Sequence, residues 1–252
     1  MGSNNRYSNE EWQARCELAA LYRMIAHFRM TDLIDTHISL RVPGPEHRFL
    51  INRYGVLFDY MRASDLVLID QHGRAVDGQD AVMEVNAAGF TIHSAVHMAR
   101  ADMNCVIHTH TAAGMAVSAQ EQGLLPITQH ALKFYGKLSY HTYEGVALCL
   151  DERERLVADL GNNRAMILRN HGLLAGGRNV AEAFHEIHFL ERACQAQIQA
   201  LAGGSKLIFP SEEVCRLTAS QFTDDDEGMR IIQMAWDAAL KLIAAQRDEY
   251  CS

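Results

Sequence analysis

Residues 105–110 read Cys-Val-Ile-His-Thr-His, a largely apolar run that ends in two histidines one residue apart. In a β-strand, residues i and i+2 point to the same face, so His108 and His110 would present their imidazoles side by side. A second apolar run, residues 165–168, leads to His171, which is followed by a glycine that would permit a tight turn. Three imidazoles at one point leave coordination positions open, as catalytic metal sites require. We therefore expect these histidines to bind one divalent metal ion, whereas each of them alone would be read as a structural histidine at a strand end.

The composition is that of an ordinary globular protein: 252 residues, 48% hydrophobic and 21% charged. Neither a linker nor a repeat divides the chain, so we expect one domain. The formal net charge of −8, without a cluster of Lys or Arg, opposes binding to nucleic acid or to anionic membranes. The six cysteines are scattered, with no C-x-x-C spacing and no secretory signal, which favours reduced thiols in a cytoplasmic protein.

Hydrophobic periodicity outlines alternating helices and strands. It predicts an antiparallel meander of three strands at 38–42, 48–51 and 66–69, and further strands at 138–141, 147–149 and 165–168. It predicts helices at 9–30, 86–100, 112–120, 151–160, 180–202 and 229–245. Helices at the ends and between the strands indicate a sheet covered on both faces.

Two further histidine pairs have the helical spacing of metal ligands, His93 with His97 and His185 with His188. Many ordinary histidines share this spacing, so we favour a structural or surface role for both pairs. The acidic run at 224–227 is read as a solvated helix start rather than a cation site.

Four segments, at 85–95, 105–111, 167–173 and 180–184, together resemble the class II aldolase/adducin family, closest to its adducin-like branch. The likeness runs from about residue 11 to 201, which would make 202–252 a helical extension of a single domain over 1–252. The resemblance implies an α/β fold of three α/β/α layers around a mixed, largely antiparallel sheet. It also implies a cytoplasmic homotetramer with sites at subunit boundaries.

In the aldolases of this family, the histidines that match His108, His110 and His171 hold a zinc ion, and manganese or ferrous iron are the alternatives. Those aldolases also use a glutamate to move protons, at the position that is Gly89 here. Their phosphate pocket is changed as well, because Thr36-His37, Tyr54-Gly55 and Ala87-Ala88 replace its donor pairs and only the turn glycine is kept. A sugar phosphate is therefore a poor candidate for the substrate.

These features predict a metal-dependent lyase that acts on a small, unphosphorylated oxo or hydroxy acid or a related carbonyl compound. The residues expected to face the substrate are His37, Asn52, Gly55 and His130, and a structural hydrogen bond accounts equally well for each polar one. Glu84 and Tyr135 are weaker candidates for the missing proton-transfer group.

Two other functions stay open. The chain could be a non-catalytic, adducin-like structural module with a vestigial site, although adducins carry a long basic tail and this sequence ends at Ser252. It could also be a non-haem iron oxygenase or decarboxylase, because three neutral imidazoles suit Fe(II).

Overall fold

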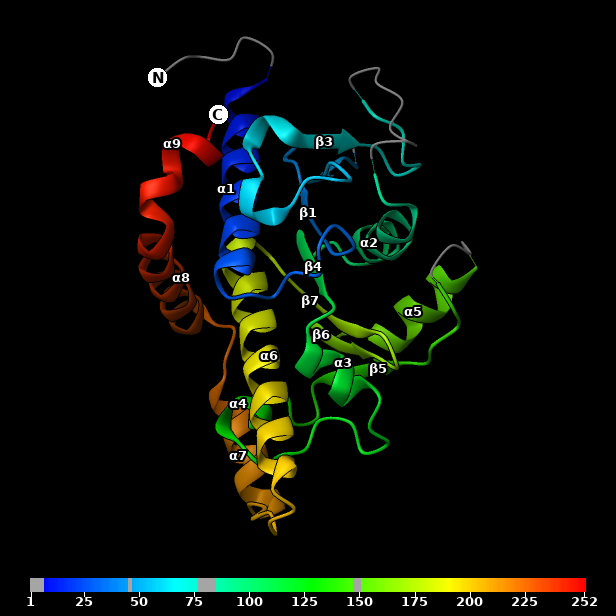
Figure 1. Ribbon diagram of the computed structural model, residues 1–252, viewed down its shortest axis with the longest axis vertical. Helices are drawn as coiled ribbons and strands as arrows, with labels where there is room; N and C mark the ends of the chain where they lie inside the picture. The colour runs from blue at the N-terminus through cyan, green and yellow to red at the C-terminus, as the bar shows by residue number, and fades with distance from the viewer. Residues whose placement is uncertain (1–6, 45–46, 77–84, 147–150) are drawn as a thin grey trace.

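The computed structural model describes residues 7–44, 47–76, 85–146 and 151–252, and a seven-stranded sheet lies at its centre (Figure 1). The strand order is β3-β2-β1-β4-β7-β6-β5. Neighbouring strands are antiparallel except β5 and β6, which are parallel. The strands are β1 (His37–Arg41), β2 (Phe49–Asn52), β3 (Leu66–Ile69), β4 (Cys105–Thr109), β5 (Leu138–His141), β6 (Ala165–Leu168) and β7 (Gly172–Gly177).

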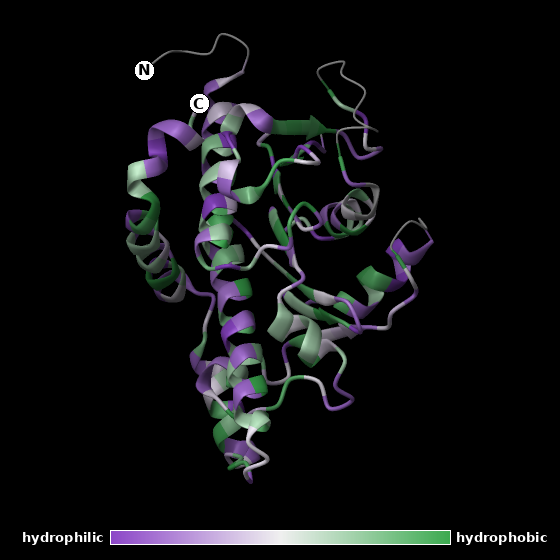
Figure 2. Ribbon diagram, in the orientation of Figure 1, coloured by the Kyte–Doolittle hydropathy of each residue, from purple (hydrophilic) through white to green (hydrophobic). Residues whose placement is uncertain are grey.

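Helices cover both faces of this sheet (Figure 1). They are α1 (Asn9–His27), α2 (Ala87–Ala99), α3 (Ala112–Ser118), α4 (Gln129–Leu132), α5 (Glu152–Leu160), α6 (Val180–Ala202), α7 (Glu212–Gln221), α8 (Asp226–Leu240) and α9 (Arg247–Tyr250). The side chains of β4 alternate between the two faces: Cys105 and Ile107 pack in the core with α1 and α6, whereas Val106 packs with α2 and α5. Figure 2 shows the helices striped with polar and apolar residues, as two-faced packing requires. The predicted three-layer α/β/α fold with a mixed, largely antiparallel sheet is confirmed.

The helices after residue 202 return along α1 and α6. Ile232, Trp236 and Tyr250 belong to the same hydrophobic core as those two helices, and Arg23 of α1 pairs with Glu249 at 2.9 Å. The division at residue 201 stays a prediction. Among the described residues, no helix has the length and apolarity needed to cross a membrane.

Most predicted elements are present within a few residues. The helix expected at 229–245 ends as an α-helix at Leu240 and continues as a 3-10 helix over Lys241–Gln246. The sequence analysis did not anticipate β7, α4, α7 or α9, and the strand expected at 147–149 falls outside the described residues.

Candidate metal centre

The three predicted histidines come together at the ends of β4 and β6. The Nε2 atom of His110 lies 2.7 Å from that of His108 and 3.0 Å from that of His171. His108 leaves β4 on the face that α2 covers, while His171 lies in the turn between β6 and β7. The three side chains form the one group among the described residues whose His, Cys, Asp or Glu ligand atoms could hold a metal ion.

The turn before β7 brings His171 to the other two histidines. We expected the glycine at 172 to provide the tight turn, and this was wrong: Asn170 takes the left-handed conformation, with φ of 54°. Gly172 is needed for close approach instead, because a Cβ there would lie 2.3 Å from the carbonyl oxygen of Thr109 and 3.1 Å from the His110 ring. Any larger residue would push the start of β7 away from the end of β4.

The hydrogen bonds of two ring nitrogens show that a cation fits this group. His108 Nδ1 lies 2.9 Å from the Leu173 carbonyl oxygen, and His110 Nδ1 lies 3.2 Å from a carboxylate oxygen of Asp32. Both oxygens can only accept, so both Nδ1 atoms donate, and both Nε2 atoms of the neutral rings carry bare lone pairs. Two lone pairs 2.7 Å apart repel each other unless a cation lies between them. The donor set therefore fits a divalent metal of the zinc type.

Burial favours the neutral form of the His108 and His171 imidazoles, which metal ligation requires. Burial is the main cause that lowers the pKa of His171 to about 4, and the neighbouring His110 ring adds to it. Burial also holds the pKa of His108 well below its usual range, with a further contribution from His37. His110 stays 17% exposed, so the group opens to solvent on its side.

Three residues that the sequence analysis missed support the group. Asp32 orients His110, as described above, and Tyr143 lies beside His171 with the ring centres 6.2 Å apart. Buried Glu191 of α6 accepts a short hydrogen bond from Thr111, whose hydroxyl also caps α3. This contact fixes the residue directly after His110. Asp32 and Glu191 are 78 and 80 residues from their partners along the chain, so no local pattern points to them.

The residues expected to face the substrate separate in the structure. His37 is buried beside the metal group, with its ring centre 5.0 Å from that of His108. Asn52 is buried with its Oδ1 atom 2.9 Å from the Tyr22 hydroxyl, which is the structural role that had been weighed equally. Gly55 forms an open turn with φ of 90°. His130 stacks on Phe189 of α6, and no contact within the described chain joins it to the three histidines.

The two candidates for proton transfer gain no support. Glu84 lies outside the described residues. Tyr135 follows α4, where its backbone nitrogen donates to Leu132, and the described residues show no contact between Tyr135 and the metal group. Both residues stay predictions.

Gly89 on α2 is enclosed by the His37 ring. A Cβ at this position would lie 2.5 Å from His37 Cδ2 and 2.9 Å from His37 Nε2. The absence of a side chain at Gly89 is therefore what makes room for His37.

We expect Gly89→Ala to destabilise the protein by about 1–3 kcal/mol, although alanine alone would favour the helix by about 1 kcal/mol. Overpacking costs about 1–3 kcal/mol, and moving the His37 ring also breaks a buried hydrogen bond to His93. Urea unfolding measures the difference. Gly203→Ala is the matched control, because its new Cβ would have its nearest neighbour, Ser205 Oγ, at 3.9 Å. A stabilised Gly89→Ala protein would contradict this packing.

Among the described residues, neither of the remaining histidine pairs belongs to a group that could hold a metal ion, as we favoured. His93 and His97 are buried on α2, and both rings contact the Ser39 hydroxyl. His185 stacks on Phe189, and His188 packs against Phe28.

The pKa of His97 predicts acid sensitivity. Burial, followed by the nearby Arg41, lowers the pKa of His97 to about 3. Below pH 6.5 this imidazole is therefore protonated in the unfolded chain but stays neutral in the folded protein. For such a group the free energy of unfolding falls by about 1.4 kcal/mol for each pH unit of acidification. We expect His97→Gln to lose about 2 kcal/mol less than the wild type between pH 7.5 and 5.0 in urea titrations. Exposed His72→Gln should keep the wild-type dependence, and an identical loss in all three proteins would refute the assignment.

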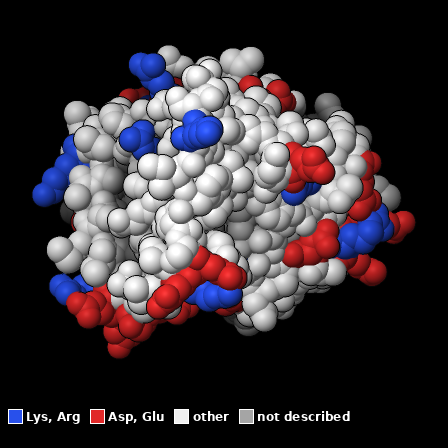
Figure 3. All heavy atoms as spheres, turned by 90° about the horizontal axis from the view of Figure 1, so that it is seen from below, with Lys and Arg blue, Asp and Glu red and all other residues white. Residues whose placement is uncertain are grey.

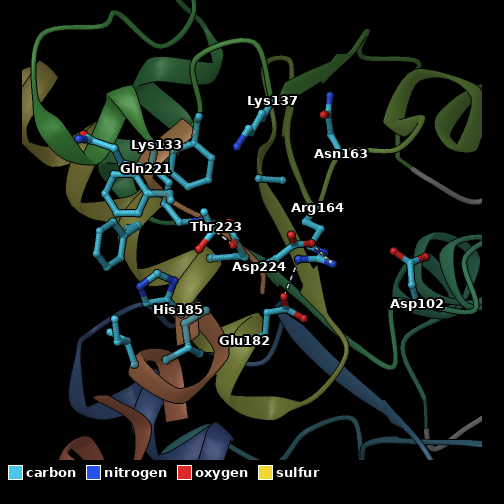
Figure 4. Close-up of a pocket in the computed structure, with 18 of the residues that line it drawn as sticks. Asp102, Lys133, Lys137, Asn163, Arg164, Glu182, His185, Gln221, Thr223 and Asp224 are labelled. Atoms are coloured by element: carbon cyan, nitrogen blue, oxygen red, sulfur yellow. Dashed lines mark hydrogen bonds and ion pairs between the residues drawn. The ribbon is translucent and has the colours of Figure 1, made fainter. Parts of the chain in front are cut away.

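A cavity lies at another part of the molecule (Figure 4). It has a volume of about 680 Å³ and is bordered by α4, α6, α7, α8 and the start of β6. Its main charges neutralise one another, since Lys133 pairs with Glu186, and Arg164 pairs with Glu182 and Asp224. The metal group is at the opposite ends of β6 and β7, so we do not place the reaction in this cavity.

Comparison with known proteins agrees with this fold. Residues 16–198 match the family described as the class II aldolase and adducin N-terminal domain. The crystal structure of an aldolase II superfamily protein from Pseudomonas syringae is 48% identical in sequence, with a TM-score of 0.91 over 100% of both chains.

Two further relatives mark the two branches of the family. L-fuculose 1-phosphate aldolase from Glaciozyma antarctica is 27% identical, with a TM-score of 0.81, over 96% of this chain and 92% of that one. Alpha-adducin from Rattus norvegicus is 43% identical over 197 residues, which are 78% of this chain but only 27% of the adducin. On these matches, the chain belongs to the class II aldolase and adducin family.

Proposed function

We propose that the protein is a metal-dependent lyase of the aldolase type. The observation that carries this proposal is the convergence of two bare Nε2 lone pairs, 2.7 Å apart, with a third imidazole beside them. The aldolase relatives support the reaction class. We propose zinc as the metal, with manganese and ferrous iron as alternatives.

The protein would hold the metal through His108, His110 and His171. A divalent metal bound there supplies a Lewis acid that stabilises negative charge on substrate oxygens. The Leu173 carbonyl and the Asp32 carboxylate fix two of the rings in the tautomer that ligation needs. The partial exposure of the His110 side chain leaves the substrate a way to approach the centre from solvent.

We propose a small, unphosphorylated oxo or hydroxy acid, or a related carbonyl compound, as the substrate. The positions that hold phosphate in the sugar-phosphate aldolases carry other groups here. The His37 ring bonds to His93, and the Tyr54 hydroxyl lies 3.3 Å from an Asp35 carboxylate oxygen. The Asp32 carboxylate beside His110 would also repel a phosphate dianion.

The test is a panel of hydroxy and oxo acids, each with and without a phosphate group, given to protein loaded with zinc, manganese or ferrous iron. Carbonyl products are trapped as hydrazones and identified by mass spectrometry. We expect metal-dependent cleavage of an unphosphorylated compound, and none with His110→Ala. Cleavage of sugar phosphates alone would refute the substrate class, and oxygen consumption in the ferrous sample would favour an oxygenase.

The likeness to alpha-adducin favours a second candidate, a structural module that keeps a vestigial site. Co-sedimentation of the protein with actin filaments tests it. Filament binding together with an inactive substrate panel would reverse our ranking.

We also propose a cytoplasmic homotetramer. The described cysteines are all unpaired, which suits a reducing compartment.

Figure 3 shows a face whose centre carries few charges, with acidic side chains gathered toward its edges. Ile231, Met234 and Leu242 are each more than half exposed along α8 and the turn that follows it. Light scattering tests the assembly, with an expected mass of four times the 28.2 kDa chain.

A further inference from the structure

A string of buried polar side chains leads from the far end of α2 to the metal centre. It begins at the carbonyl oxygen of Met103, which lies 3.2 Å from His97 Nδ1. His97 Nε2 and His93 Nδ1 each lie 2.6 Å from Ser39 Oγ. His93 Nε2 then lies 2.8 Å from His37 Nδ1. These four side chains are at most 3% exposed.

The carbonyl at the start fixes the direction of every hydrogen bond in the string. In its neutral form each of the three imidazoles carries one N–H, so it donates from one ring nitrogen and accepts at the other. The Met103 oxygen accepts from His97 Nδ1, which leaves His97 Nε2 as an acceptor for the Ser39 hydroxyl. The Ser39 oxygen in turn accepts from His93 Nδ1, which leaves His93 Nε2 as the acceptor for His37 Nδ1–H.

The string therefore ends on His37 Nε2 as a bare lone pair. No hydrogen-bond partner for this atom is found in the described part of the chain. His37 pairs with His108 across β1 and β4, and their ring centres are 5.0 Å apart. The absence of a side chain at Gly89 gives the Nε2 edge of the ring its room.

We propose that His37 is the catalytic base of the lyase, taking the proton of the substrate hydroxyl on Nε2 while Ser39, His93 and His97 position its ring. This inference rests on the proposed function. In cleavage, the O–H bond breaks to Nε2, the oxygen–carbon bond becomes a carbonyl, and the carbon–carbon electron pair passes to the oxo fragment. The same proton then passes from Nε2 to the carbon that received the electron pair. The released aldehyde or ketone and the oxo compound together contain all the atoms of the substrate.

Nitrogen-15 NMR of the histidine rings tests the direction of the string without any substrate. We expect His37 to have a protonated Nδ1 and a bare Nε2. Ser39→Ala should release His93 and His97 and mix the tautomers of all three rings, whereas Ser39→Thr keeps the hydroxyl and should restore the wild-type spectrum. A His37 ring protonated on Nε2 in the wild type would overturn the proposal.

The chemical role is tested by His37→Gln in protein loaded with zinc. Elemental analysis should find the wild-type metal content, because His37 is not one of the three ligands. With the substrate that the panel identifies, kcat should fall about 10²–10⁴-fold, the usual contribution of a general base, with little change in KM. Exchange of the methyl hydrogens of pyruvate for deuterium in D₂O follows the return of the proton separately, and it should fall in the same variant.

The outcomes separate this inference from the proposed function. If the wild type neither cleaves any compound in the panel nor exchanges the methyl hydrogens of pyruvate, the proposed lyase function is refuted, and with it the role of His37 as its base. If the wild type is active and His37→Gln retains its kcat, only the role of His37 is refuted. His72→Gln, at an exposed histidine, is the matched control and should keep both activities.

Discussion

His110→Ala should weaken zinc binding at least about 100-fold. The loss of a residue that only hydrogen-bonds to a metal ligand costs about 10–100-fold in metal affinity, and loss of a ligand itself should cost more. His110 is the central member of the group, because its Nε2 is the atom within 3.0 Å of both others. Asp32→Asn should give an intermediate loss of about 10–100-fold, since the amide only weakens the hydrogen bond that orients the ring. Isothermal titration and elemental analysis measure both effects.

The same variant should leave the metal-free fold intact. Removing the His110 imidazole removes its ring contacts with His108 and His171, but it also removes a lone-pair repulsion. We therefore expect the metal-free unfolding free energy to change by less than about 1 kcal/mol. Zinc at 100 times its Kd should stabilise the wild type by about 2.7 kcal/mol and the variant hardly at all. A His110→Ala protein that kept one equivalent of zinc at this site would refute the assignment, and His72→Ala should match the wild type throughout.

The grouping of His108, His110 and His171 could be predicted because its signals are local. Alternation in a strand places His108 and His110 together, and the apolar run before His171 places it at a strand end. Strand β7 lies between β4 and β6 in the sheet and could not be predicted. Residues 172–177 read Gly-Leu-Leu-Ala-Gly-Gly and contain no β-branched residue. Pairing with β4 on one side and β6 on the other makes this segment a strand.

The sequence analysis named His37 as a substrate-facing residue, but the hydrogen-bonded string behind its ring could not be predicted, for a different reason. His93 and His97 gave a spacing signal, but their partner Ser39 lies 54 and 58 residues away in the chain. The contact depends on how α2 docks over β1, which no local pattern encodes. In the sequence, Gly89 indicated only that an acid or base is missing from this position. In the structure, the His37 ring fills the space where a side chain at Gly89 would lie.

Glu182→Ala should lower the free energy of unfolding by about 2–4 kcal/mol, the largest stability effect that we expect from one substitution. The Glu182 side chain is 1% exposed and lies 2.5 Å from Arg164 Nη1, while its other oxygen accepts the backbone N–H of Arg178 at 2.6 Å. It therefore joins the start of β6, the end of β7 and the first turn of α6. Arg164 and Arg178 are 21% and 37% exposed, so water relieves part of their loss and keeps the cost below that of a fully buried pair.

Glu227→Ala is the control for this substitution. Its ion pair with Arg230 is long, at 3.8 Å, and both side chains are exposed, so we expect a change below about 0.5 kcal/mol in urea unfolding. Zinc affinity provides a second control, because Glu182 lies at the opposite ends of β6 and β7 from His171. Glu182→Ala should therefore lose stability but keep zinc, the reverse of His110→Ala. Loss of both in Glu182→Ala would mean that the two ends of the sheet are coupled, and that the metal centre depends on the whole fold rather than on the local turn at Asn170.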